Sequence, residues 1–225
     1  MKLSIIMPVY NERETISRIL EKVRSLDMQK EIIVVDDHSK DGTSEYLHSL
    51  AKEDSFKVLF HDQNLGKGAA IRTGLEHVTG DAVVIQDADL EVNPKELPRV
   101  VKPIEEGIAR VVYGSRFKSG NSFSWITLAA NRILTALTNL LYNVHISDME
   151  TCYKCIETSL IKSLELKARG FDFEPEVTAK IAKRRIRIHE VPISYRMRSV
   201  REGKKIGWRD GLQAVYFLLK YRFTE

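Results

Sequence analysis

The sequence has 225 residues, of which 43% are hydrophobic and 29% are charged, and this is enough for one large α/β domain or two small ones with a buried core. The net charge of +4 suits anionic ligands, and no block of Lys and Arg interleaved with aromatic residues indicates a nucleic-acid groove. Two cysteines provide no disulfide framework, so a reducing compartment is expected, and no run of about 18 apolar residues indicates a transmembrane span.

The first half of the chain alternates apolar runs with amphipathic segments. Runs typical of buried strands cover residues 3–9, 31–35, 58–60 and 82–85, and segments with helical spacing cover residues 12–26, 46–51 and 69–78. The first apolar run breaks at Pro8 and is too short for a signal peptide. This β-α-β-α-β-α-β order predicts an α/β fold with a parallel sheet and helices on both of its faces.

Polar side chains follow each of these four strands. They are Tyr10, Asn11 and Glu12 after the first strand, Asp36, Asp37 and Ser39 after the second, Asn64, Gly66 and Lys67 after the third, and Asp87, Asp89 and Glu91 after the fourth. The carboxyl ends of parallel strands lie along one edge of a sheet, where open α/β sheets bind their ligands. The four groups therefore predict a cleft for a polar, phosphorylated ligand.

The group after the fourth strand consists of three acidic residues. Asp87 and Asp89 are two residues apart and point the same way in an extended chain, and Glu91 joins them if the chain stays extended. Carboxylate oxygens at this density suit Mg²⁺ or Mn²⁺, although an acidic loop that caps the next helix is an alternative. The chain has neither a G-x-G-x-x-G turn nor a Walker A loop around Lys67, so carboxylates and a metal are the expected means of holding a nucleotide.

The second half of the chain contains further elements of both kinds. Helical spacing covers residues 97–104, 124–143, 173–185 and 208–221, and apolar runs typical of strands lie at 109–113, around 152–155 and at 187–191. The helix at 124–143 carries Arg132 near its middle, which argues against a transmembrane span. The helix is therefore interpreted either as a core helix or as one wall of an acceptor site. The final helix either packs on the domain or lies on a membrane surface.

Four motifs in this order resemble the GT-A nucleotide-sugar transferases of glycosyltransferase family 2. They lie at residues 7–12, 34–43, 64–68 and 87–89, and the resemblance, which covers nearly the whole chain, is closest to the polyprenyl-phosphate (dolichol-phosphate) mannose or glucose transferases. It implies a Rossmann-like three-layer sandwich with a mostly parallel central sheet. It also implies a single catalytic domain, 1–225, with a nucleotide-sugar half at 1–115 and an acceptor half at 116–225 that ends in an amphipathic helix.

The resemblance also implies roles for individual residues. Donor-binding residues would be Pro8, Tyr10, Glu12, Asp37, Lys67, Asp87 and Asp89, and the metal, Mg²⁺ or Mn²⁺, would be held by Asp87, Asp89 and Glu91. Residues that bind the acceptor or its phosphate would be Arg116, Arg132, Glu174, Arg201 and Lys205, the last two in a basic lid at 195–207. For Glu174, positioning the sugar is an alternative to positioning the acceptor. Catalytic residues would be Asp89, Arg116 and Asp148. Alternatives from the residues themselves are a helix-capping role for Asp37, a macrodipole role for Glu174 and a solvated loop in place of the lid.

The activity implied is an inverting, metal-dependent transfer of a hexose, with mannose from GDP-mannose as the first expectation, to a polyprenyl or dolichyl phosphate. A phosphate oxygen is already anionic and needs no strong base, whereas a sugar hydroxyl acceptor would need a carboxylate base, for which Asp148 is the candidate. The alternatives are a UDP-sugar-dependent transfer of glucose or GlcNAc to a lipid phosphate or a sugar hydroxyl, and a non-catalytic nucleotide-sugar binding protein. We expect no nucleic-acid partner and a cytoplasmic location with peripheral contact at the membrane face.

Overall fold

The computed structural model describes residues 1–51, 55–119, 121, 124–198 and 208–224. Within these residues the strands form one seven-stranded sheet in the order β3-β2-β1-β4-β6-β5-β7. The strands are β1 (Leu3–Val9), β2 (Lys30–Asp36), β3 (Lys57–Phe60), β4 (Ala82–Ile85), β5 (Val111–Ser115), β6 (Lys154–Glu157) and β7 (His189–Pro192). All strand pairs are parallel except those that β6 makes with β4 and β5. The predicted mostly parallel α/β sheet is therefore confirmed.

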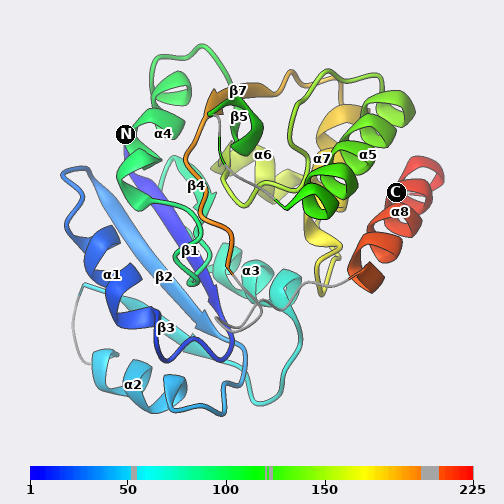
Figure 1. Ribbon diagram of the computed structural model, residues 1–225. Helices are drawn as coiled ribbons and strands as arrows, with labels where there is room; N and C mark the ends of the chain where they lie inside the picture. Colours follow the sequence, from blue (N-terminus) through cyan, green and yellow to red (C-terminus); the bar gives the residue numbers. More distant parts are fainter. Residues whose placement is uncertain (52–54, 120, 122–123, 199–207, 225) are drawn as a thin grey trace.

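Helices cover both faces of this sheet (Figure 1). They are α1 (Ile16–Arg24), α2 (Thr43–Leu50), α3 (Lys67–Glu76), α4 (Leu97–Glu105), α5 (Trp125–Tyr142), α6 (Thr158–Ser163), α7 (Phe173–Lys183) and α8 (Trp208–Phe223), with 3₁₀ turns at Pro94–Glu96 and Arg116–Lys118. Because side chains alternate along a strand, Ile5 and Ile6 of β1 enter different cores. Helices α1, α2 and α4 complete the core of Ile5, and α3 and α5 to α8 complete the core of Ile6.

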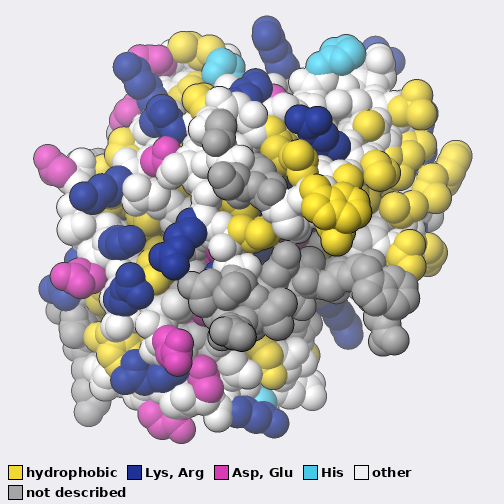
Figure 2. Space-filling model, in the orientation of Figure 1, with side chains coloured by type: hydrophobic (Ala, Val, Ile, Leu, Met, Phe, Trp, Pro, Cys, Tyr) yellow, Lys and Arg dark blue, Asp and Glu magenta, His cyan; other side chains and the backbone are white. Residues whose placement is uncertain are grey.

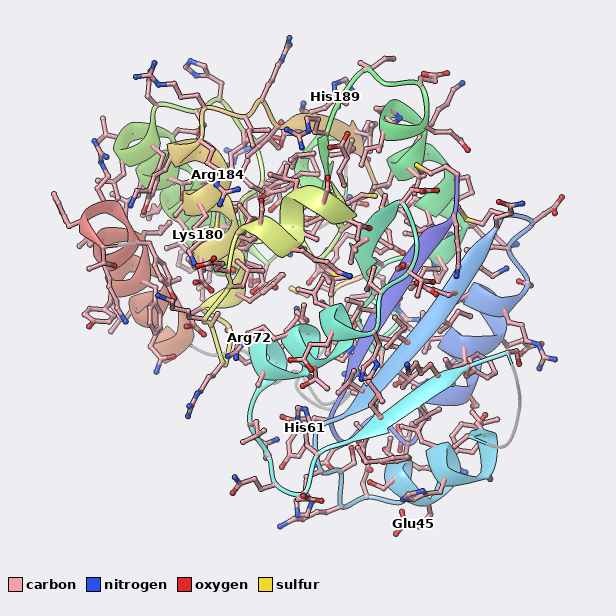
Figure 3. All side chains as sticks on the ribbon, turned by 180° about the vertical axis from the view of Figure 1, so that it is seen from behind. Glu45, His61, Arg72, Lys180, Arg184 and His189 are labelled. Atoms are coloured by element: carbon pink, nitrogen blue, oxygen red, sulfur yellow. The ribbon has the colours of Figure 1, made fainter. Side chains whose placement is uncertain are left out.

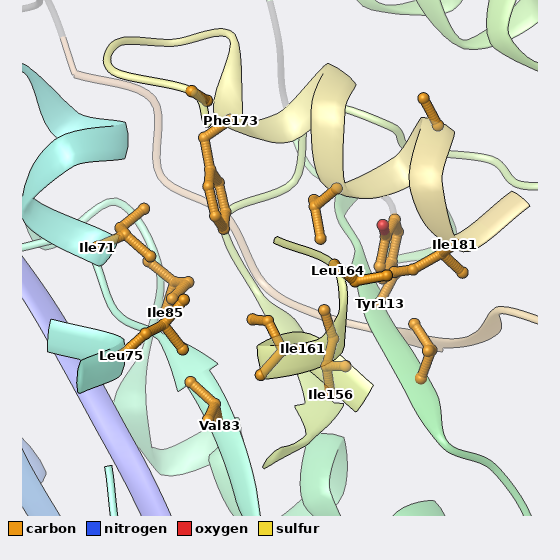
Figure 4. Packing of buried hydrophobic residues seen from close by; sticks show 14 of the residues in the cluster. Ile71, Leu75, Val83, Ile85, Tyr113, Ile156, Ile161, Leu164, Phe173 and Ile181 are labelled. Carbon is orange, nitrogen blue, oxygen red and sulfur yellow. The ribbon is translucent and has the colours of Figure 1, made fainter. Parts of the chain in front are cut away.

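The core that contains Ile6 extends across the sheet from β2 to β5. Ile71 of α3 packs near Ile85 of β4, and further along the same core Phe173 and Ile181 of α7 lie over Ile161 and its neighbours (Figure 4). The sheet itself also connects the predicted halves, because β5 lies between β6 and β7. The division at residue 115 into a nucleotide-sugar half and an acceptor half stays a prediction.

Local signals explain where α5 begins and ends. The Ser124 hydroxyl accepts a hydrogen bond from the Thr127 backbone N–H at 3.3 Å, which satisfies one of the free donors of the first turn. At the other end Asn143 adopts a left-handed conformation, with φ of 52°. Among the residues that the structure describes, none of the helices has both the length and the apolar composition needed to cross a bilayer.

The sheet register places the first four strand ends together. Val9 at the end of β1 pairs with Asp36 at the end of β2, and Asp36 pairs with Phe60 at the end of β3. On the other side of β1, Ile6 pairs with Ile85 at the end of β4. The polar residues that follow these strands consequently project from one edge of the sheet.

Candidate functional site

A cavity of about 850 Å³ lies at this edge of the sheet and is lined by residues from all four strand-end loops. Ten of the residues singled out in the sequence line it: Pro8, Tyr10, Glu12, Asp37, Lys67, Asp87, Asp89, Glu91, Arg116 and Glu174. Helices α5 and α8 provide an apolar part of the wall. Arg132 and Asp148 do not line the cavity, and Arg201 and Lys205 lie outside the described residues.

Lys67 occupies the centre of the polar part of the wall. Its ammonium lies 3.0 Å from Asp87 Oδ1 and 2.9 Å from Glu174 Oε1. Burial opposes the charge on Lys67, but the two carboxylates outweigh burial and hold its pKa above the usual range. Burial likewise opposes the charge on Asp87, and Lys67 outweighs it, so the pKa of Asp87 is lowered. Lys67 and Asp87 are therefore both held in their charged forms.

Backbone geometry sets the position of Lys67 at the start of α3. The residue before it, Gly66, has φ of +95°, a conformation that favours glycine. A Cβ atom at Gly66 would lie 2.4 Å from the Arg169 carbonyl oxygen, so only glycine allows the two loops to approach this closely. Lys67 is thereby directed from the end of the third βα loop toward the acidic loop after β4.

The acidic loop after β4 differs from the expectation. The chain does not stay extended: it turns at Ala88 and Asp89, and Leu90 adopts a left-handed conformation with φ of 63°. Glu91 is therefore directed elsewhere, and its two carboxylate oxygens accept hydrogen bonds of 2.8 Å from the Tyr195 hydroxyl and the Arg198 backbone N–H. The Glu91 carboxylate is thus engaged within the protein, and its role as a third metal ligand stays a prediction.

Asp87 and Asp89 both face the cavity. Asp89 Oδ1 accepts a hydrogen bond of 3.0 Å from the Glu91 backbone N–H, and burial, together with the charges of Asp87 and Glu91, raises the pKa of Asp89 to about 7. In the described part of the chain, no group of three or more His, Cys, Asp or Glu side chains is arranged to hold a metal ion. The donor set of the two aspartates still fits a hard divalent cation that takes its remaining ligands from a diphosphate or water. Metal binding at Asp87 and Asp89 stays a prediction.

The beginning of the predicted lid lies along this acidic loop. Tyr195 forms an antiparallel bridge with Val92, and the Arg198 guanidinium pairs with Glu12 across the cavity, with Nη1 3.2 Å from Oε1. A segment late in the chain thus connects the loop after β1 with the loop after β4. Residues 199–207, which carry Arg201 and Lys205, are outside the described residues, so the roles of these two basic side chains are not tested.

Asp37 organises the loop that precedes Lys67. Its carboxylate accepts hydrogen bonds from the backbone N–H groups of Leu65 at 2.8 Å and Gly66 at 2.7 Å, and it lies 2.7 Å from His61 Nδ1. His61 lies directly after β3, and its Nε2 is 2.9 Å from the Thr73 hydroxyl of α3 (Figure 3). The helix-capping alternative for Asp37 is not observed, because Asp41 accepts the hydrogen bond from the backbone N–H of Thr43 in the first turn of α2. Sequence reasoning did not identify His61.

Arg116 and Asp148 form a bidentate ion pair. Arg116 Nε donates to Asp148 Oδ2 and Nη2 donates to Oδ1, both at 2.8 Å, and the Arg116 backbone N–H adds a third bond of 2.9 Å. Burial opposes the charge on Arg116, but Asp148 outweighs burial and raises the pKa of Arg116 further. Asp148 is 0% exposed and is not among the residues that line the cavity, so its role as a catalytic acid or base gains no support from this arrangement and stays a prediction. It positions Arg116, which does line the cavity.

The cavity-facing side of α5 follows helical spacing. Thr127, Ala130, Asn131 and Leu134 repeat at the i, i+3, i+4 and i+7 positions and all line the cavity. Arg132 lies off this stripe and is exposed, so the expectation that it reaches an acceptor phosphate is not supported. The neighbouring residue, Asn131, faces the cavity instead, and its Oδ1 accepts a hydrogen bond of 3.4 Å from Arg116 Nη2.

Glu150 lines the cavity but was not among the predicted site residues. Its loop is held by Lys154, whose buried ammonium donates to the carbonyl oxygens of Met149, at 2.8 Å, and Thr151. Burial, with the charge of Glu174, raises the pKa of Glu150 to about 7. In the sequence, Glu150 is one of two acids, with Asp148, in a motif that departs from the family pattern at Cys152. The motif alone does not tell which of the two acids faces the cavity.

Comparisons with known sequences agree with this arrangement. The family model described as "Glycosyl transferase family 2" matches residues 4–164. The chain is similar to the undecaprenyl-phosphate 4-deoxy-4-formamido-L-arabinose transferase of Edwardsiella ictaluri, with 29% identity over 208 residues that cover 90% of this chain and 62% of the relative. It is also similar to the dolichol-phosphate mannosyltransferase of Pyrococcus furiosus, with 28% identity over 98% of this chain and 64% of the relative. The chain thus spans somewhat less than two thirds of these relatives.

Solved structures share the whole fold at low sequence identity. The glucosyl-3-phosphoglycerate synthase of Mycobacterium tuberculosis, crystallised with Mn²⁺, UDP and phosphoglyceric acid, matches 100% of this chain and 79% of its own with a TM-score of 0.76 and 23% identity. TarS of S. aureus in complex with UDP-GlcNAc matches 98% of this chain and 66% of its own with a TM-score of 0.64 and 19% identity. These likenesses confirm the predicted three-layer α/β architecture.

Proposed function

The chain belongs to glycosyl transferase family 2 and is therefore a glycosyltransferase, and we propose that it transfers a hexose from a nucleoside-diphosphate sugar to a polyprenyl phosphate. The observation that carries this proposal is the continuity of one cavity. It runs from the Asp87, Asp89 and Lys67 cluster, past Arg116, to the apolar faces of α5 and α8. Anionic groups and a lipid chain could thus meet in one space.

The polar part of the cavity fits the diphosphate of the donor. Asp87 and Asp89 would hold Mg²⁺ or Mn²⁺, which when bound neutralises the charge on the leaving nucleoside diphosphate. Lys67 keeps Asp87 ionised and directed into the cavity at 3.0 Å. Asp37 keeps the turn before Lys67 in place, and Pro8, Tyr10 and Glu12 line the adjacent wall, where the nucleoside would lie.

Arg116 fits the acceptor phosphate. Asp148 holds the guanidinium from behind, so the arginine presents a fixed positive charge to the cavity. A phosphate oxygen is anionic at neutral pH, so it can attack the anomeric carbon without transferring a proton to the protein. Asp148, the base candidate that the sequence offers, is completely buried, and this supports an acceptor that needs no base.

The exposed apolar surface of α5 and α8 supports a lipid acceptor. Trp125 is 77% exposed and Leu140 is 81% exposed on α5, and Leu212 and Tyr216 are exposed on α8. The two helices are in contact, and hydrophobic side chains gather over both of them (Figure 2). Ile126, Ile133, Leu212 and Val215 also line the cavity, so the apolar surface continues into it. We infer that this surface receives the polyprenyl chain and contacts the membrane peripherally, because exposed patches of this kind mark interaction sites.

Mannose from GDP-mannose is the proposed donor, supported by the similarity to a dolichol-phosphate mannosyltransferase. Glucose or GlcNAc from a UDP-sugar is the second candidate. Thermal-shift measurements with GDP-mannose, UDP-glucose and UDP-GlcNAc, each with and without Mn²⁺, separate them, because the true donor should stabilise the protein only with the metal.

Transfer of the stabilising sugar to polyprenyl phosphate then tests the reaction. We expect turnover by the wild-type protein and by Asp62→Ala, an exposed control, and no turnover by Asp89→Ala. If Asp89→Ala turned over as fast as the wild type, the proposal that transfer depends on a metal at Asp89 would be wrong. If the donor transfers its sugar only to a sugar hydroxyl, the lipid-phosphate acceptor is wrong.

A further inference from the structure

Two buried carboxylate oxygens lack a hydrogen-bond partner among the described residues, and both belong to glutamates that line the cavity. They are Glu150 Oε1 and Glu174 Oε2. Glu174 is only 5% exposed, and its other oxygen is used by Lys67. Because a buried acceptor without a donor is costly, such atoms in a cavity indicate a ligand that brings the missing donors.

The position of the two glutamates relates them to the donor. Lys67 forms ion pairs with both Asp87 and Glu174. Glu174 is thus linked through Lys67 to Asp87, beside which the diphosphate of the donor would lie. Glu150 lies on the loop that follows Asp148, the partner of Arg116, and Lys154 holds this loop through the carbonyl oxygens on both sides of Glu150. Both glutamates line the same cavity as Asp87 and Arg116, and Glu150 is close enough to feel the charges of both Glu174 and Arg116.

The chemistry of the pair limits what it can bind. Phosphate brings only acceptor oxygens and negative charge at neutral pH, so it would be repelled by two carboxyl groups. A hexose brings several hydroxyl donors on a compact ring, and each can donate to one carboxylate oxygen. This argues against the earlier expectation that Glu174 binds the acceptor phosphate.

We propose that Glu150 and Glu174 bind hydroxyl groups of the hexose that is transferred and so select the sugar of the donor. The inference rests on the proposed function, because it takes the donor to be a nucleoside-diphosphate sugar with its diphosphate beside Asp87. It assigns the unpaired oxygens Glu150 Oε1 and Glu174 Oε2 as the sugar acceptors. The remaining Glu174 oxygen stays with Lys67.

Glu150→Gln is the diagnostic variant, because Glu174→Gln would also change the partner of Lys67. Calorimetry without acceptor would measure the binding of GDP and GDP-mannose, and of UDP, UDP-glucose and UDP-GlcNAc, each with Mn²⁺. We expect the Glu150→Gln variant to bind the preferred sugar donor about tenfold more weakly than the wild type, and to bind the free nucleoside diphosphate equally well. Glu21→Gln on the exposed side of α1 is the matched control and should change neither affinity.

The outcomes separate this inference from the proposed function. If Glu150→Gln weakens donor and free nucleoside diphosphate equally, or weakens neither, the sugar-binding role is wrong while the proposed function stands. If its kcat falls with donor affinity unchanged, Glu150 acts on the acceptor, and the inference also fails. If the wild-type protein binds no nucleotide of the panel, the proposed function itself is wrong. The melting temperature of Glu150→Gln should not fall, because the change replaces a carboxyl group whose charge is opposed by burial with a neutral amide of the same shape.

Discussion

Lys67 Nζ lies 2.9 Å from Glu174 Oε1, although the two residues are 107 positions apart in the sequence. Lys67 begins the helix after the third strand, and Glu174 lies in the first turn of α7. The same ammonium is 3.0 Å from Asp87, so one buried cation joins the donor loop to the second half of the chain. Neutral substitutions at Lys67 should therefore affect both folding and binding.

Lys67→Met should destabilise the protein by about 3–5 kcal/mol, because it leaves the carboxylates of Asp87 and Glu174 without their buried partner. Urea denaturation measures this loss. Lys102→Met is the matched control, because Lys102 makes only an exposed ion pair with Glu106, and it should change stability by less than about 1 kcal/mol. If Asp87 binds a divalent cation, Mn²⁺ should raise the melting temperature of Lys67→Met more than that of the wild type. Equal shifts would argue against a metal beside Lys67.

Asp148→Asn should lower transfer about as much as Arg116→Ala, because Asp148 acts only by holding Arg116. The expected loss is on the order of 100-fold in kcat/KM, the size found when a positioned charge is removed from an active site. The double variant should be scarcely worse than either single variant, since both changes remove the same function. The pH profile of Asp148→Asn should keep the shape of the wild-type profile. Loss of an acidic limb in this variant would instead identify Asp148 as a base.

The pH dependence of stability should report on Glu150. Its pKa is raised from 4.5 to about 7 in the folded protein, so between these values the folded state holds a proton that the unfolded state has lost. Stability from this group is therefore lost as the pH rises from about 4.5 to about 7. Glu150→Gln should gain about 1–3 kcal/mol relative to the wild type over this interval. A constant difference between the two proteins from pH 4.5 to 7 would contradict a raised pKa.

Membrane contact should depend on the exposed apolar side chains of α5 and α8. The double variant Trp125→Ser and Leu140→Ser should bind lipid vesicles at least about tenfold more weakly in a sedimentation assay, because burying even one such side chain contributes about 1.5–3 kcal/mol. Ile108→Ser is the control, since Ile108 is 66% exposed but lies between α4 and β5. Transfer to a short-chain polyprenyl phosphate should be retained by all of these variants. Unchanged vesicle binding by the double variant would rule out this surface as the lipid contact.

The first four strands illustrate what could be predicted. The apolar runs at 3–9 and 82–85 coincide with β1 and β4, because a buried strand has a local signature in its own residues. The polar residues after these strands line one cavity, because the carboxyl ends of parallel strands meet at one edge of the sheet regardless of how the connecting segments fold. The antiparallel direction of β6 was not predicted, since pairing direction depends on how the chain returns after α5.

The acidic residues illustrate what could not be predicted. Spacing alone places Asp87, Asp89 and Glu91 on one side, but a left-handed Leu90 directs Glu91 to Tyr195, which is 104 residues away. Helical spacing marks α5 as amphipathic without telling whether Asn131 or Arg132 faces the cavity. In each case the missing information is a contact between segments that are distant in the sequence.

By itself, the sequence determined the family, the α/β sheet and the edge where the chemistry gathers, because strand periodicity and short motifs are properties of neighbouring residues. Only the tertiary structure decided which carboxyl groups are available to a ligand. Both carboxylate oxygens of Asp148 accept hydrogen bonds from Arg116, whereas Glu150, two positions later, keeps a buried oxygen that has no hydrogen-bond partner in the described part of the chain. The physical reason is that the charge state and accessibility of an acid depend on the cations and donors around it, and here these come from every part of the chain.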